Sequence, residues 1–109
     1  MAATYKILGQ QAPAATTEVD LYTVPGGTSA VVSSIVICNR GATYTAINVS
    51  VSASGGATAD KDYIYHSLTV PANDTFIGAV ALTLSATDVV RVYSISGEVS
   101  FSLFGTEIS

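Results

Sequence analysis

Hydrophobic and polar residues alternate along most of the chain, and no segment shows helical spacing over more than one turn. A period of two places successive side chains on opposite faces of an extended segment, which is typical of β-strands with one buried face. Abundant Val, Ile, Thr and Tyr residues favour the same structure. The pattern predicts an all-β protein with strands at residues 4–9, 18–24, 28–38, 44–53, 62–70, 75–84, 88–95 and 98–104.

Short stretches rich in Gly, Pro, Asn and Asp separate these strands, as turns require. The tight link from Ile95 to Glu98 predicts that the last two strands form a hairpin. Residues 54–61 form the longest soft loop and the best candidate for mobility. About eight antiparallel strands are enough for a two-sheet sandwich, of either the jelly-roll or the immunoglobulin-like kind.

Two stretches of the chain resemble each other: LYTVPGGT at 21–28 and SLTVPANDT at 67–75. Each ends a predicted strand in Val-Pro, turns, and resumes on Thr before an apolar strand. Two copies are too few for a solenoid, which needs at least about three repeats. We therefore interpret them as two similar β-arches, one in each half of the sandwich.

The first seventeen residues differ from the rest, because a short apolar strand, TYKIL, precedes a small, polar, proline-broken stretch, QQAPAATT. Such a stretch buries little apolar area and resembles a linker. We expect residues 1–17 to form an extended arm and residues 18–109 to form the β-sandwich domain. The arm can add a strand to a neighbouring subunit, or it can be an edge strand of its own domain.

The amino-acid composition indicates how the protein acts as well as how it folds. At 109 residues the chain fits one domain. It is 49% hydrophobic but 11% charged, against about 25% charged in typical domains. No apolar run reaches the roughly 18 residues of a membrane span, so we expect no membrane partner. The excess apolar surface favours a protein–protein interface, and we expect a homo-oligomer, a trimer.

The charges argue against a nucleic-acid partner, because the net charge is −4 and the four basic residues are scattered. The first ten residues lack the pattern of a signal peptide, so we expect synthesis in a cytoplasm. Cys38 has no second cysteine to pair with. We interpret it as a small buried strand residue, with an intersubunit disulfide as the alternative.

Few residues suggest chemistry. His66 is the one histidine, and strand alternation places it with Ile64, Leu68 and Val70 on one apolar face. We interpret it as a core or interface histidine. Asp60, Asp62 and His66 match no established metal-ligand spacing. We therefore expect no enzyme activity, no metal and no cofactor. Tyr63 and Tyr65, two residues apart on one strand face, favour cross-strand packing, with an aromatic platform for a sugar ring as the alternative.

Several strand and turn segments occur in a recognisable order. They are YKILGQ at 5–10, ATT at 15–17, LYTVP at 21–25, SSIVICNR at 33–40, VPANDT at 70–75 and FGTEI at 104–108. In this order the chain resembles small structural proteins of tailed bacteriophages, particularly those that infect cyanobacteria. The similarity covers nearly the whole chain, and its motifs are structural rather than chemical.

The resemblance implies a virion protein on the outer surface of a phage capsid, made in the host cytoplasm. Such a decoration or cement protein clamps neighbouring major capsid subunits and carries no catalytic residues. The alternative is a tail, neck, fibre or baseplate module that adheres to host glycans through residues 54–66. The residues that we expect to contact partners are Tyr5, Ile7, Leu8, Pro25, Gly26, Pro71 and Asn73.

Overall fold

A computed structural model describes residues 2–109, which form nine strands and two short 3-10 turns. The all-β prediction is confirmed, and the predicted strand at 75–84 is split by Ala79–Ala81 into two. None of the helical turns in the described residues is long or apolar enough to cross a membrane. The strands are β1 Ala3–Gln11, β2 Val19–Thr23, β3 Ser29–Asn39, β4 Thr45–Ser52, β5 Tyr63–Val70, β6 Thr75–Gly78, β7 Leu82–Leu84, β8 Val89–Ser94 and β9 Val99–Ile108, and the turns are η1 Ala53–Gly55 and η2 Asp60–Asp62.

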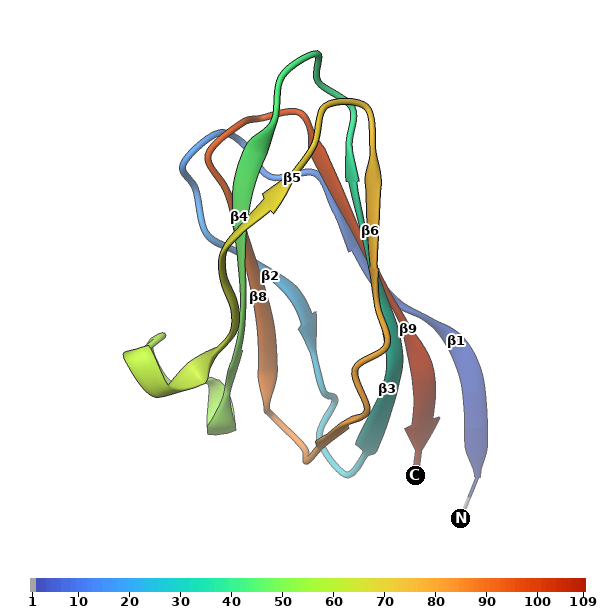
Figure 1. The fold of residues 1–109 in the computed structure, drawn as a ribbon. Coiled ribbons are helices and arrows are strands. Elements are labelled where there is room, and N and C mark those ends of the chain that lie inside the picture. The colour runs from blue at the N-terminus through green and yellow to red at the C-terminus, as the bar shows by residue number, and fades with distance from the viewer. Residues whose placement is uncertain (1) are drawn as a thin grey trace.

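The strands form two antiparallel sheets that face each other (Figure 1). Sheet A has the order β1-β9-β3-β6, and β7 also pairs with β3. Sheet B has the order β2-β8-β4-β5. Because β6 and β7 lie end to end along β3, they act as one interrupted strand. The predicted two-sheet sandwich is confirmed, and this strand order is that of a jelly roll rather than an immunoglobulin-like fold.

The two similar stretches are β-arches, as expected. The β2–β3 and β5–β6 connections both carry the chain from sheet B to sheet A. Val24 follows the last residue of β2, and Val70 is the last residue of β5. Both valines are at most 1% exposed, and the proline that follows each of them is on the surface. Burial of the valine holds the end of the strand in the core, while the proline disfavours continuation of the ladder.

The predicted hairpin of the last two strands is wrong. β8 pairs with β2 and β4 in sheet B, whereas β9 pairs with β1 and β3 in sheet A. A two-residue hairpin turn needs positive φ angles. Among residues 2–109, the glycines with positive φ are Gly27 and Gly55, so Gly97 does not supply that geometry. The link at 95–98 is instead a crossing between sheets.

The core lies between the inner faces of the two sheets and is formed by alternate strand residues. β3 and β9, which are flanked by strands on both sides, contribute its largest fully buried side chains in sheet A: Ile35, Ile37, Phe101 and Leu103. In sheet B, Ile47 and its neighbours on β4 and β8 face them. Burial of each such side chain stabilises the fold by about 1.5–3 kcal/mol.

The N-terminal strand lies along its own domain. β1 pairs with β9, and the register shifts between Ile7 and Gly9, so that Leu8 turns into the core and is 9% exposed. A Cβ atom at Gly9 would collide with the carbonyl oxygen of Leu21, so β1 approaches β2 closely there. Exchange of the arm between subunits would replace this pairing with the same pairing to a neighbour's β9, and it stays a prediction.

Candidate functional site

The outer face of sheet A is made of the strand residues that alternate with the buried ones. Each cross-strand row on this face combines apolar side chains with Ser or Thr, and none of these positions carries a charged residue. The face consists of Ala3, Tyr5, Ile7, Gln10, Ser29, Val31, Ser34, Val36, Cys38, Thr75, Ile77, Thr83, Ser100, Ser102, Phe104, Thr106 and Ile108.

Large apolar side chains on this face are open to solvent. Tyr5 is 84% exposed, Ile77 68%, Ile7 50% and Val31 39%. They are four of the six large hydrophobic residues that are exposed in residues 2–109. Cys38 is half-buried here rather than buried in the core as expected. Large apolar side chains that gather on one exposed face indicate an interaction site in soluble proteins.

The outer face of sheet B is polar and is organised around Arg91 of β8. The guanidinium donates from Nε to Asp20 Oδ1 at 3.0 Å and from Nη1 to Ser52 Oγ at 3.0 Å. It also donates to the backbone carbonyl oxygens of Gly56 at 2.7 Å and Gly55 at 3.3 Å. Since its side chain is 15% exposed, Arg91 holds the segment after β4 down on the sheet.

The carboxylate of Asp62 also fixes the segment after β4. Asp62 Oδ2 accepts from the backbone N–H of Ala59 at 2.9 Å and from Ser52 Oγ at 3.4 Å, and Lys61 Nζ lies 2.8 Å from Oδ1. The hydrogen bond from Lys61, followed by that from Ala59, holds the pKa of Asp62 below its ordinary value. The loop predicted at residues 54–61 therefore includes parts of two 3-10 turns that are tied to sheet B, and its mobility stays a prediction.

Beside this segment, a recess of about 240 Å³ is lined by Asp60, Tyr63 and His66. The rings of Tyr63 and His66 meet edge to face, with centroids 4.8 Å apart and an interplanar angle of 73°. Asp60 belongs to η2, and the two rings belong to β5. The recess thus combines an aromatic surface, an imidazole and a carboxylate at the free edge of sheet B.

A β-bulge explains why His66 is exposed and not a core histidine, although alternation places it with Ile64, Leu68 and Val70. The pairing of β5 with β4 shifts between Tyr65 and Leu68, so His66 and Ser67 together oppose Asn48. Ser67 has φ of 54°, and its backbone N–H donates to Asn48 Oδ1 at 2.7 Å. A bulge reverses the alternation, which turns His66 outward.

A second register shift between β5 and β4, at Tyr63 and Tyr65, separates residues that alternation places on one face. Tyr65 turns toward the sandwich interior and packs edge to face on Phe76, with ring centroids 5.3 Å apart, so it shares no platform with Tyr63. Asp62 points under the segment, away from the recess that Asp60 and His66 line. In residues 2–109, no group of three or more His, Cys, Asp or Glu residues could hold a metal ion.

The expected partner-contact residues fall into separate places. Tyr5 and Ile7 lie on the outer face of sheet A, while Leu8 is part of the core because of the bulge after Ile7. The remaining four are exposed in the two β-arches, which lie at opposite ends of the sandwich in Figure 1. They are Pro25 and Gly26 in the β2–β3 arch and Pro71 and Asn73 in the β5–β6 arch.

No protein-family model and no curated protein sequence matches this chain. The indications of its function therefore lie in the surfaces described above and in the chemistry that they offer.

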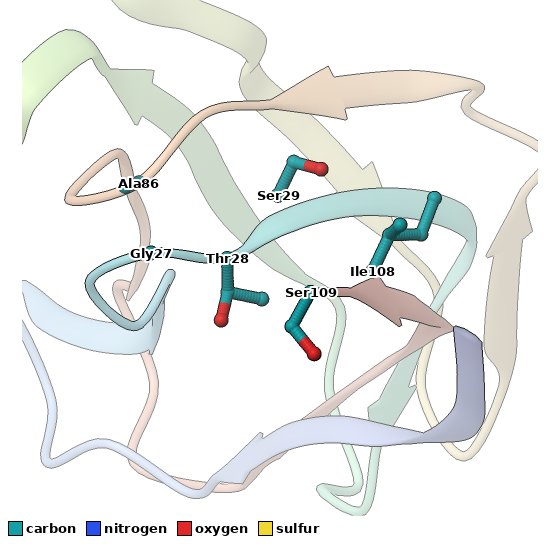
Figure 2. A pocket seen from close by; sticks show the side chains of 6 residues that line it. All are labelled: Gly27, Thr28, Ser29, Ala86, Ile108 and Ser109. Carbon is teal, nitrogen blue, oxygen red and sulfur yellow. The ribbon is translucent and has the colours of Figure 1, made fainter. Parts of the chain in front are cut away.

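A larger recess, about 550 Å³, lies near the C-terminus and is shown in Figure 2. Its side chains are small or apolar, and none of them is an acid, a base or a strong metal ligand. Its polar side chains are the hydroxyl groups of Thr28, Ser29 and Ser109. Its lining consists of Gly27, Thr28, Ser29, Ala86, Ile108 and Ser109.

Glu107 is a structural carboxylate that sequence reasoning did not identify. It accepts from Tyr22 Oη at 2.6 Å and pairs with Lys6 Nζ at 3.1 Å, which joins β9 to β2 and β1. These two bonds, that from Tyr22 first, hold its pKa below the ordinary value. Burial, followed by the bond to Glu107, raises the pKa of Tyr22.

Asn39 is another residue whose role the sequence pattern hid. The predicted strand stops at residue 38, yet Asn39 ends β3 and is 1% exposed. Its amide donates to the backbone carbonyls of Thr43, Val70 and Pro71, at 2.9, 3.2 and 3.1 Å, and Oδ1 accepts from Gly41 N–H. It fastens the β3–β4 loop to the β5–β6 arch, a structural role.

Proposed function

We propose that this protein is a structural module of a phage virion, a decoration protein that docks the outer face of sheet A onto the major capsid protein. The observation that carries the proposal is that no charged residue occupies the strand positions of that face, where Tyr5, Ile7, Val31 and Ile77 are open. Arg40, which donates to Ser100 Oγ, lies at its rim. The resemblance of the sequence to phage structural proteins supplies the partner.

The strand sequences of sheet A support a third layer. A strand buried on one face alternates apolar and polar residues, whereas one covered on both faces is apolar nearly throughout. β3 has the sequence SAVVSSIVICN, with apolar or small residues on both faces up to its buried terminal Asn39. The sandwich covers one of these faces, and a flat protein surface is the partner that would cover the other.

A face without charges fits the clamp mechanism. It neither repels identical copies nor needs an oppositely charged partner, so neighbouring copies can crowd on one lattice. Each contact of modest area contributes a small stabilisation that multiplies over the many symmetric copies. Jelly rolls occur in viral capsid proteins, which agrees with the proposal, although a fold does not determine a function.

Binding to capsids tests the proposal. Expanded capsids stripped of this protein should bind it saturably and then rupture at a higher temperature, because a ligand specific for the intact lattice stabilises that lattice. Binding should persist in moderate salt, since screening acts on charges. Light scattering of the free protein decides whether the docking unit is the expected trimer.

Two variants with the same change in charge locate the docking face. Ile77→Lys places a charge on the outer face of sheet A, and Tyr93→Lys places one on the outer face of sheet B. We expect Ile77→Lys to lose capsid binding by about a hundredfold, as a desolvated charge of several kcal/mol implies, while Tyr93→Lys binds normally. Unchanged rupture temperature, or equal binding by both variants, rejects the proposal.

A further inference from the structure

We propose that the recess formed by Asp60, Tyr63 and His66 binds one ring of a neutral saccharide. This inference goes beyond capsid docking, because the recess lies on sheet B and the docking face lies on sheet A. The ring of Tyr63 offers a flat surface to the apolar C–H face of a sugar, and the imidazole and carboxylate hydrogen-bond its hydroxyl groups.

The size of the recess favours a small ligand. Its volume is about 240 Å³, below the roughly 300–1,000 Å³ of sites that take drug-sized molecules. One pyranose ring fits this space. Adjacent rings of an oligosaccharide would extend into solvent along the free edge of β5.

The polar atoms of the recess are not consumed by the fold. The three ion pairs found in residues 2–109 join Lys6, Lys61 and Arg91 to Glu107, Asp62 and Asp20. Asp60 takes part in none of them, although it lies two residues from Asp62. Its carboxylate can accept two hydroxyl hydrogen bonds, and His66, 4.8 Å from Tyr63 between ring centroids, can donate one or accept one.

The surrounding structure holds these groups in place before a ligand arrives. Asp62 fixes η2 through the N–H of Ala59, and Arg91 fixes the carbonyls of Gly55 and Gly56. On β5, the bond from the Ser67 N–H to Asn48 Oδ1 maintains the bulge that presents His66. A preorganised site loses less conformational entropy on binding, which matters for a weak ligand.

The charges of the recess select the class of ligand. Asp60 disfavours phosphates and other anions, and the net charge of −4 acts in the same direction. A carboxylate and one imidazole make an incomplete set for a structural metal, which usually takes four ligands or more. A neutral, hydroxyl-rich ring stacked on an aromatic side chain fits these groups.

Titration of the ¹⁵N-labelled full chain by NMR tests the inference. The probes are glucose, galactose, mannose, rhamnose and N-acetylglucosamine, followed by short oligosaccharides of whichever binds. At least one should shift the amide signals of residues 60–66 saturably, with a millimolar dissociation constant. Tyr63→Ala should weaken that binding by about tenfold or more, since it removes the stacking surface.

Two further variants separate binding from folding. His66→Gln keeps a hydrogen-bonding side chain on an exposed position and should weaken binding severalfold without loss of the folded spectrum. Tyr44→Ala is the matched control, because Tyr44 is 75% exposed but lies in the β3–β4 loop, away from this recess. We expect it to bind as the unmodified protein does.

Three results would overturn the proposal. The first is the absence of shifts at residues 60–66 with every probe, and the second is equal binding by Tyr63→Ala and Tyr44→Ala. The third is binding that EDTA abolishes, because the site would then act through a divalent cation. Capsid docking is measured separately with Ile77→Lys, so failure here leaves the proposal for sheet A standing, and the reverse also holds.

Discussion

The two outer faces of this sandwich are built on the same period-two pattern and differ in almost every physical property. The outer face of sheet A is uncharged and exposes large apolar side chains such as Tyr5 and Ile77. The outer face of sheet B is polar, with Arg91 and Asp62 bonded to the segment that covers part of it. Sheet B supplies its own cover, and sheet A has none within the described chain.

The difference originates in the outward positions of the strands. In β4, TAINVSVS, the outward residues that follow the buried Ile47 and Val49 are Asn and Ser. In β3 the corresponding outward positions include Val31 and Val36. Both strands bury the same kind of inner face, so alternation predicts the core in each. The outward residues alone distinguish a face that meets solvent or a covering loop from one suited to another protein.

Among the polar contacts of the two sheets, the largest expected effect on stability comes from cutting the network of sheet B. Arg91→Ala removes hydrogen bonds to Asp20, Ser52 and the carbonyls of Gly55 and Gly56. Because these groups are partly buried and would lose a charged donor, the free energy of unfolding should fall by about 2 kcal/mol. Urea denaturation measures the change.

Arg40 provides the matched control, since it is an arginine at the rim of sheet A. It donates to Ser100 Oγ at 2.9 Å and to the Gly97 carbonyl at 3.4 Å, both in exposed positions. Arg40→Ala should cost less than about 0.5 kcal/mol. Equal losses for the two variants would mean that the Arg91 network does not hold the segment at 53–62 in place.

Acid should weaken both sheets through particular carboxylates. Asp62 and Glu107 have folded-state pKa values below the ordinary 3.8 and 4.5, so each contributes stability at neutral pH that is lost as the pH falls below that range. The free energy of unfolding should decline from pH 6 to pH 3. Asp62→Asn should flatten this decline. An identical decline in the variant and the unmodified protein would contradict the role of Asp62.

The sequence predicted the fold well because strand periodicity and turn residues are local properties. Nearly every strand appears where alternation placed it, and the shared Val-Pro arches appear at Pro25 and Pro71. Strand pairing is not local, which is why the hairpin around Gly97 was predicted wrongly. A short link with a glycine suits a hairpin turn and a crossing between sheets equally, and the sheet to which each strand belongs decides between them.

The candidate sites were harder to predict, because each depends on a break in alternation or on a distant partner. The bulge at His66 and Ser67 reverses the face of β5, and no glycine or proline marks it. Arg91, the one charged residue of β8, was a visible anomaly in an apolar strand, yet its partners come from residues 20 and 52–58. The low charge of the whole chain agrees with the uncharged strand positions on the outer face of sheet A.

The smallest expected effect concerns folding and is the sharpest test of the contrast within sheet A. Ile77→Thr changes a side chain that is 68% exposed, and it should alter the free energy of unfolding by less than about 0.5 kcal/mol. Ile35→Thr makes the same substitution at a position 1% exposed on the inner face, and it should cost about 3 kcal/mol, because it removes buried apolar groups and buries a hydroxyl. Thermal and urea unfolding of the pair measure both values. If Ile77→Thr destabilises the isolated protein as much as Ile35→Thr does, the outer face of sheet A is already packed within the free protein. It would then be unavailable to a partner.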